Sequence, residues 1–191
     1  SRFIGLVWSD TVSVKLGWQP WHQVVALRDD VKSGELSLAT FAADLDDVAK
    51  GSAKKVYQDT TEFFSLTFPT FNIRELAKDV VNRLAGKNDK AVRQLELTYG
   101  GGKTHTLITL YHLVHDPEKL PDLPAVNEFI EHIGLRPPKS RVAVLAFDKL
   151  DVEKGMEVRD TRGKLRRLRQ PWSILAYQIA GADGLRLLHA E

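Results

Sequence analysis

The sequence predicts an α/β fold in which a mainly helical N-terminal region, residues 1–88, precedes a unit built on parallel strands, residues 89–191. In the first part, apolar residues recur three and four positions apart, as they do on one face of an amphipathic helix. In the second part, apolar runs at residues 92–99 and 141–147 enclose a helix-patterned stretch, which is the order of a strand–helix–strand crossover. A chain of 191 residues, 43% of them hydrophobic, is long enough to bury a core of this kind.

Two helices are expected before residue 70. The first begins at Ser37 and ends near Gly51, where a glycine can adopt the left-handed conformation that closes a helix. The second is one short aromatic-rich helix within residues 54–68, and Pro69 stops it. The first helix also carries three carboxylates, which we expect to form a solvated face because no histidine accompanies them at metal-ligand spacing: Asp44, Asp46 and Asp47.

The third helix has the strongest signals at both of its ends. Asn72, with Glu75 three positions later, has the pattern of a capping box, and Gly86 closes the helix that follows. The apolar residues between these ends form one continuous face. Residues 86–90 are polar, and we expect the boundary between the two parts of the chain there.

The second part of the chain alternates between strand and helix signals. The run at residues 141–147 is nearly continuously apolar, as expected of a strand buried on both faces of a parallel sheet. A short helix is expected before it, at residues 126–133. Residues 151–169 are polar and contain a basic run, after which Pro171 starts a helix that ends at Gly181. These elements predict a partial three-layer α/β unit.

The most informative motif is a run of three glycines followed by a lysine and a threonine: Gly100, Gly101, Gly102, Lys103 and Thr104. Glycines allow successive backbone N–H groups to converge on an anion, and the N-terminus of the following helix adds partial positive charge. The lysine ammonium can reach the β- and γ-phosphates of a nucleotide, and the threonine hydroxyl can bind Mg²⁺. A strand before this run and a helix after it are the local architecture of a P-loop NTPase, so a nucleotide with Mg²⁺ is the expected ligand.

The motif departs from the full P-loop pattern, because Leu97 stands where the first glycine is expected. The alternative is a glycine-rich connector with Lys103 and Thr104 exposed to solvent, and the flanking strand and helix favour the nucleotide site over it. His105 would lie close to a bound phosphate, or it would only cap or pack the helix, and we expect no catalytic role for it. Asp148 follows the second strand without another acidic residue beside it, so we expect it to shape the edge of the site rather than bind magnesium.

Composition limits the partners of the chain. The 27 lysines and arginines against 25 acidic residues leave a net charge of +2, so no overall field favours nucleic acid or an anionic membrane surface. The chain has no cysteine, which fits a reducing compartment, and we expect a cytoplasmic location. No stretch approaches the roughly 20 apolar residues of a membrane-spanning helix, and we expect no membrane partner.

Together with the glycine–lysine motif, several blocks resemble the N-terminal part of the domain of unknown function 499 family. These are large bacterial ATP-binding proteins, AAA-like relatives of the P-loop ATPases found in phage-defence gene clusters. Near the motif, the likeness includes Leu95, Tyr99 and residues 111–113. Further blocks lie at residues 20–25, 30–34, 41–45, 62–64, 171–172 and 176–178. The resemblance spans most of the chain, and the combination of blocks is more specific than the motif alone.

The resemblance implies that residues 100–104 bind the phosphates of ATP, with Thr104 on Mg²⁺ and His105 nearby. It also implies that this chain is the N-terminal portion of a larger ATPase, whose later part supplies an acidic magnesium-binding strand and arginine sensors. We therefore expect no hydrolysis from this piece alone. The implied partners are the remainder of such a chain and other proteins of a defence complex, and the restriction of foreign DNA is an association of the family.

Two other functions stay open at this point. The basic run at residues 164–169 could bind nucleic acid or a protein, although it lacks interleaved aromatic residues and a solvated loop is the simpler interpretation. Alternatively, the helical region at residues 1–86 could dock into a larger assembly without any turnover of its own. Magnesium-dependent ATP binding, salt-dependent DNA binding and molecular size at several concentrations would distinguish the three.

Overall fold

The computed structural model describes residues 20–26, 32, 42–96, 102–160 and 162–188. The chain divides into two units, Ser1–Ala42 and Ala43–Glu191. In the first unit, the described residues include the four-residue helix α2 (Trp21–Val24), which begins directly after Pro20. The predicted helix start at Ser37 lies outside the described residues.

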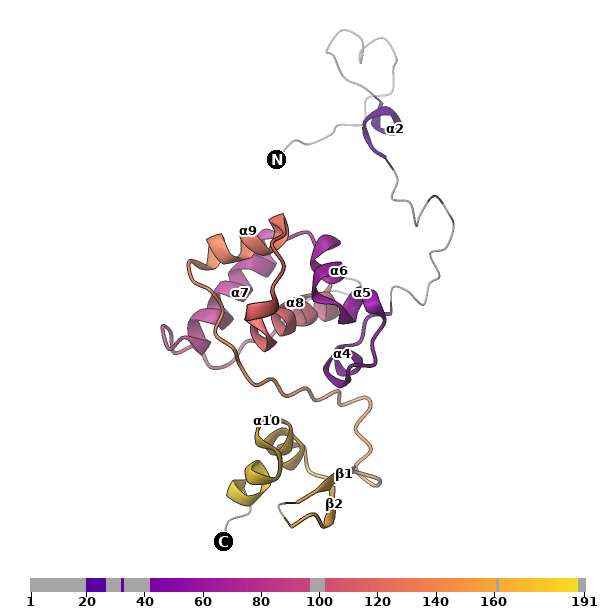
Figure 1. The fold of residues 1–191 in the computed structure, drawn as a ribbon, viewed down its shortest axis with the longest axis vertical. Helices are drawn as coiled ribbons and strands as arrows, with labels where there is room; N and C mark the ends of the chain where they lie inside the picture. Colours follow the sequence, from indigo (N-terminus) through magenta and orange to yellow (C-terminus); the bar gives the residue numbers. More distant parts are fainter. Residues whose placement is uncertain (1–19, 27–31, 33–41, 97–101, 161, 189–191) are drawn as a thin grey trace. The chain divides into compact units, whose positions relative to one another are not determined.

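The second unit is mostly helical (Figure 1). Its elements in chain order are α4 (Leu45–Lys50), α5 (Lys55–Gln58), α6 (Thr60–Ser65), α7 (Phe71–Leu84), α8 (Lys103–His115), the 3-10 helix η2 (Pro117–Lys119), α9 (Pro124–Ile133), β1 (Met156–Arg159), β2 (Leu165–Leu168) and α10 (Pro171–Leu188). In the described residues the sheet consists of β1 and β2, which pair antiparallel with Met156 opposite Leu168. The fold therefore combines α and β structure, with helices dominating. None of the described helices is both long enough and apolar enough to cross a bilayer.

The main core lies among the helices between α4 and α9. α7 packs against α9, and α8 contacts both α7 and α4. Phe64 meets Phe129 edge-on with ring centroids 6.1 Å apart, and full burial of such a side chain contributes about 1.5–3 kcal/mol to stability. At the rim, Arg74 of α7 forms an ion pair with Glu128 of α9. The buried residues of this core are Val48, Phe63, Phe64, Ala77, Val81, Ile108, Leu113, Val114, Val126, Phe129 and Ile133.

A smaller core forms between the hairpin β1–β2 and α10. Its buried residues are Val158, Leu168, Ile174 and Leu185. α10 is interrupted at Gly181, which has φ 59° and ψ −143°, and this is where the sequence predicts the helix to end. Beyond the interruption, Gly184 lies so close to Ala176 that a Cβ would stand 2.1 Å from its carbonyl oxygen. A side chain at that position would force the two halves of α10 apart.

Several helix ends that glycine and proline predict are confirmed. Gly51 closes α4 with φ 74°, and Gly86 follows α7 with φ 72°. Pro171 is the first residue of α10, a position where the missing N–H of proline leaves no hydrogen bond unmade. These signals succeed because each depends on the backbone conformation of a single residue.

Two predicted features of the helical region are wrong. α7 begins at Phe71, after Thr70 with extended backbone, so Asn72 lies inside the helix and does not cap it. Residues 54–68 form two helices rather than one. The break lies at Asp59, whose extended backbone separates α5 from α6 and whose carboxylate accepts the N–H of Glu62 at 2.8 Å. A cap of this kind starts a new helix within a sequence that is helix-favouring on both sides.

α4 also begins later than the predicted start. Residues 42–44 are not helical, and the helix starts at Leu45. Asp44 causes this start, because its backbone is extended and its Oδ1 accepts the N–H of Asp46 at 2.8 Å. The apolar pattern upstream of Asp44 therefore does not extend the helix through residues 42–44.

The described residues contain no parallel strand pair, although two such strands are predicted. Residues 92–96 pair with no strand there, and the side chain of Val92 is 82% exposed. The run at residues 141–147 likewise has no strand neighbour among the described residues. A side chain instead pairs with its backbone, since the N–H of Val144 donates to Gln178 Oε1 at 2.6 Å and Gln178 Nε2 donates to the Val144 carbonyl at 2.9 Å. Gln178 thus makes the two bonds that a neighbouring strand would otherwise make.

His112 is a buried polar residue of the main core that joins α8 to two other helices. Its Nε2 lies 2.8 Å from the carbonyl oxygen of Tyr57, and its Nδ1 lies 3.0 Å from the hydroxyl of Thr60. A carbonyl oxygen can only accept, so Nε2 carries the proton and Nδ1 accepts from the Thr60 hydroxyl. Burial lowers the pKa of His112, and the charge of His115 acts in the same direction against the opposing effect of the Tyr57 bond.

Acidification should destabilise the protein through His112. Because its pKa in the folded state is below the ordinary value of 6.5, the neutral ring stabilises the fold above that pH. This contribution is lost as the pH falls below the unfolded-state value toward the folded-state pKa. His105, whose pKa burial also lowers, acts in the same direction. We expect the free energy of unfolding, measured by urea titration, to fall between about pH 7.5 and about pH 5.

His112→Gln isolates this contribution, because glutamine offers one donor and one acceptor without a titrating ring. The unfolding free energy of His112→Gln should vary less with pH than that of the wild type. His22→Gln, in the exposed helix α2, is the matched control and should keep the wild-type pH dependence. Equal pH dependence in His112→Gln and wild type would contradict a neutral, buried His112.

Candidate functional site

The described part of the predicted phosphate loop begins at Gly102, since Gly100 and Gly101 lie outside the described residues. Gly102 has φ 79° and ψ 20°, a left-handed conformation that residues other than glycine rarely adopt. A Cβ built there would meet no described atom within 4 Å, so it is the backbone conformation that requires the glycine. The Gly102 carbonyl accepts the N–H and the hydroxyl of Thr106, each at 2.9 Å, which closes the first turn of α8.

The N-terminus of α8 suits an anion. Among the described residues, no side chain caps this helix, and its first turn contains no acidic residue to offset the positive end of the helix dipole. Lys103 and Thr104 are its first two residues, the lysine exposed and the threonine half-buried. Phosphate oxygens can accept the backbone N–H groups that a capping side chain would otherwise satisfy. The described residues at this helix terminus are therefore compatible in charge with an anion.

His105, the third residue of α8, fixes the first turn of this helix onto the end of α6. The hydroxyl of Thr67 donates to the Phe63 carbonyl at 2.8 Å, so its oxygen accepts from His105 Nε2, at 3.2 Å. The His105 ring also stacks on the Phe63 ring, with centroids 4.7 Å apart. Burial lowers the pKa of His105, so the ring is neutral near pH 7. His105 thus has a packing role, and its proximity to a nucleotide stays a prediction.

The three carboxylates at the start of α4 are grouped closely enough to hold a metal ion, with one oxygen of each within 4.8 Å of the others: Asp44, Asp46 and Asp47. An ammonium group lies among them, since Lys149 Nζ is 2.5 Å from Asp44 and 3.2 Å from Asp47. The hydrogen bond from Lys149 lowers the pKa of Asp44, and these carboxylates raise the pKa of Lys149. The group is therefore an ion-paired anchor that ties the segment around Lys149 to α4.

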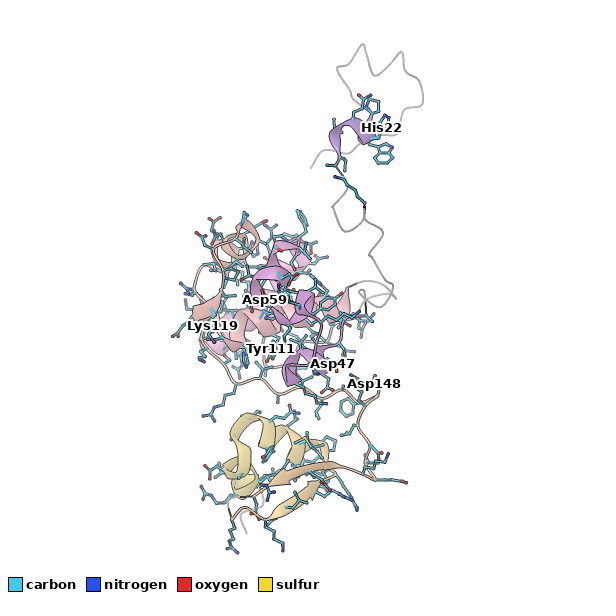
Figure 2. All side chains as sticks on the ribbon, turned by 45° about the vertical axis from the view of Figure 1, so that its right-hand side comes forward. His22, Asp47, Asp59, Tyr111, Lys119 and Asp148 are labelled. Carbon is cyan, nitrogen blue, oxygen red and sulfur yellow. The ribbon has the colours of Figure 1, made fainter. Side chains whose placement is uncertain are left out.

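Asp148, which the sequence predicts to shape the edge of the site rather than bind magnesium, directly precedes Lys149 of this anchor. Figure 2 labels it together with Asp47 of α4. Its side chain is exposed in the turn at residues 147–149. No hydrogen bond or ion pair of the described residues connects Asp148 with the first turn of α8. The structure therefore brings Lys103, Thr104 and His105 together but does not add Asp148 to them.

The basic run lies on a hairpin that the sequence analysis did not identify. Residues 164–169 include the whole of β2, which pairs with β1 across a turn at Gly163. The sequence signal for this hairpin is an alternation of apolar and charged residues with a period of two. Met156 and Val158 alternate with Glu157 and Arg159, and the turn residue Gly163 follows shortly after. The polar composition of residues 151–169 concealed this short alternation.

A known family matches most of the chain. The family model described as the DUF499 N-terminal domain matches residues 20–180, which include Gly102, all of α8 and the hairpin β1–β2. No curated protein and no solved structure matches the chain. The family match agrees with the resemblance drawn from the sequence blocks. The chain therefore belongs to the DUF499 N-terminal domain family.

Proposed function

We propose that this chain binds ATP with Mg²⁺ through residues 100–104. The observation that carries the proposal is the turn at Gly102, which opens a 13-residue helix with Lys103 and Thr104 at its first two positions. The absence of a side-chain cap in the described residues supports it, because no capping side chain then competes with phosphate oxygens for the start of the helix. The left-handed glycine supports it further, because it lets the backbone approach an anion without a side chain in between.

Each residue has a distinct part in the proposed site. Backbone N–H groups of the glycine turn and of the first helical turn donate to the α- and β-phosphates. The Lys103 ammonium adds a positive charge toward the β- and γ-phosphates, and the Thr104 hydroxyl supplies an oxygen ligand to Mg²⁺. His105 positions the turn, because its ring is fixed between Phe63 and Thr67. The magnesium ion, when bound, would neutralise part of the phosphate charge.

We propose further that residues 92–99 and 141–147 are strands of a P-loop type parallel sheet. The Gln178 side chain already pairs with both backbone groups of Val144 in the manner of a strand neighbour. In an extended chain, the backbone groups of the residues on either side, Ala143 and Leu145, point to the opposite edge. These groups have no partner among the described residues, so this edge is available to another strand.

In this proposal, turnover belongs to a larger protein. Phosphoryl transfer requires a carboxylate that holds magnesium and a group that orients the attacking water, and the first turn of α8 offers neither among its described residues. A following part of an ATPase chain would supply both. The partners would then be the remainder of that chain and other defence proteins, and the biological role would be the phage defence with which the family is associated.

Replacement of Lys103 by alanine should weaken ATP binding. A hydrogen bond to a charged group is worth about 1.5–3 kcal/mol, so we expect the dissociation constant for MgATP to rise at least about tenfold. Isothermal titration calorimetry of the wild type and Lys103→Ala measures this directly. Circular dichroism should show the same helix content for both proteins, because Lys103 is exposed.

Lys87→Ala is the matched control for this comparison. Lys87 is also an exposed lysine next to a helix terminus, and it lies outside the proposed loop. Its replacement should leave the MgATP dissociation constant unchanged. Equal affinity in wild type, Lys87→Ala and Lys103→Ala would end the assignment of residues 100–104 as a phosphate loop.

Replacement of Thr104 by valine should remove the effect of magnesium on ATP binding while keeping the shape of the side chain. The wild type should bind ATP more tightly with Mg²⁺ than with a chelator, by about tenfold, because the bound ion would link the Thr104 oxygen to the phosphates. Thr104→Val should show little difference between the two conditions, and Thr104→Ser should restore it. A magnesium effect that persists in Thr104→Val would place the metal elsewhere.

A further inference from the structure

The hairpin β1–β2 concentrates positive charge that the chain as a whole does not have. Residues 156–169 contain six arginines and lysines but two acidic residues, an excess of four charges, whereas the entire chain has a net charge of +2. All six cationic side chains are exposed: Arg159, Arg162, Lys164, Arg166, Arg167 and Arg169. The remainder of the chain is thus slightly acidic, and the positive charge is a local property of this hairpin.

Ion pairs within the hairpin neutralise two of these six charges. Arg166 Nε lies 3.0 Å from Asp160 Oδ2. Arg167 Nη2 lies 2.5 Å from Glu157 Oε1 on the opposite strand. Among the described residues, the remaining four cations take part in no ion pair: Arg159, Arg162, Lys164 and Arg169. They are therefore available to an anionic partner without the loss of an internal ion pair.

Asp160 binds two backbone groups near the tip of the hairpin. Its Oδ1 accepts the backbone N–H groups of Arg162 and Lys164, at 2.9 and 3.0 Å. Burial opposes ionisation of this carboxyl group, yet the hydrogen bonds from Arg166 and from the backbone keep its pKa below the ordinary value. Gly163, with φ 74°, completes the turn. These hydrogen bonds restrain the backbone of Arg162 and Lys164, which reduces the entropy that these two residues would lose on binding a partner.

We propose that this hairpin binds the phosphate backbone of double-stranded DNA through Arg162, Lys164 and Arg169. A two-stranded ribbon fits the major groove of B-DNA, and lysine and arginine contacts to phosphates give affinity that does not depend on base sequence. Residues 156–169 contain no aromatic side chain, and proteins that bind single strands rely on aromatic stacking, so a duplex is the better match.

An acidic protein is a poorer match for the same surface. The centre of a protein–protein interface is depleted in charged residues and enriched in aromatic anchors, whereas the outer face of this hairpin carries four alternating positions of mostly charged character: Glu157, Arg159, Leu165 and Arg167. Leu165 is 56% exposed and is the sole apolar residue of that face. Such a surface is better suited to bind a regular array of negative charges than to bind the apolar anchor residues of a protein partner.

Fluorescence anisotropy with a labelled mixed-sequence duplex of about 20 base pairs tests the proposal, because it reads out binding without assuming a base preference. The wild type should bind with a dissociation constant that rises steeply with salt. Arg162→Glu combined with Lys164→Glu should weaken binding at least about tenfold at low salt. It should also lower the slope of log affinity against log salt by about two, the value expected for two lost phosphate contacts.

The matched control reverses one arginine and one lysine elsewhere, with Arg83→Glu combined with Lys87→Glu at the end of α7. This pair makes the same change in net charge on exposed side chains outside the hairpin. Its duplex affinity should stay within about twofold of the wild type at moderate salt, where long-range charge effects are screened. Lys103→Ala should also leave duplex binding unchanged, because the proposal does not depend on nucleotide binding.

Four results with nucleic acids would overturn the proposal. These are the absence of duplex binding in the wild type, binding that salt does not weaken, equal losses in the hairpin and control variants, and tighter binding of a single-stranded oligonucleotide of the same length. Binding of polyglutamate or of anionic vesicles without binding of the duplex would assign the hairpin to a protein or a membrane surface, and would overturn it as well. Unchanged thermal melting of both double variants would exclude unfolding as the cause of any loss.

Discussion

The position of α8 depends on two imidazole rings that the surrounding helices keep neutral. His112 bonds to Tyr57 and Thr60 of α5 and α6, and His105 bonds to Thr67 and stacks on Phe63. Each ring accepts or donates at a defined nitrogen, so these contacts together restrict the rotation of α8 about its own axis. The first turn of α8, with Gly102 before it, is thereby presented by a fixed scaffold. A loop that binds an anion through backbone N–H groups needs such a scaffold, since misplaced donors lose affinity.

The same two histidines show how a polar residue can serve as core. His105 and His112 each lie on Phe63, with ring centroids 4.7 and 5.0 Å away. Buried ring nitrogens without hydrogen-bond partners would destabilise the core. Here the Tyr57 carbonyl and the Thr60 hydroxyl bond to the two nitrogens of His112, and the Thr67 hydroxyl bonds to Nε2 of His105. An apolar side chain could fill the same space without fixing the direction of α8. The histidines therefore add orientation to packing, which is what a site at the helix terminus requires.

Sequence signals predicted several helix ends that a single glycine or proline determines, but they misplaced helix starts where neighbouring residues compete as caps and missed contacts that need a distant partner. Gly51, Gly86, Pro171 and Gly181 mark helix ends because each restricts or frees its own backbone. Thr70 and Asn72 are both residue types that favour the start of a helix. The backbone is extended at Thr70 and helical from Phe71 onward, so Asn72 lies inside α7 and not at its start. The start of α8 at Lys103 followed from the glycines, whereas its attachment through Thr67 had no sequence signal, because that contact spans 38 positions.

The segment at residues 139–150 shows most clearly why strand prediction depends on context. Val142 packs against the main core, Leu145 and Leu150 pack against the smaller one, and Lys149 binds the carboxylates of α4. Three of its apolar side chains are thus packed, whereas Phe147 is exposed, and the segment has no strand beside it among the described residues. Because Gln178 pairs with Val144, the opposite backbone edge can accept a strand without breaking that pair. The apolar run therefore reflects contacts of Val142 and Leu145 with two different cores, and the strand pairing proposed for it would use the edge opposite Gln178.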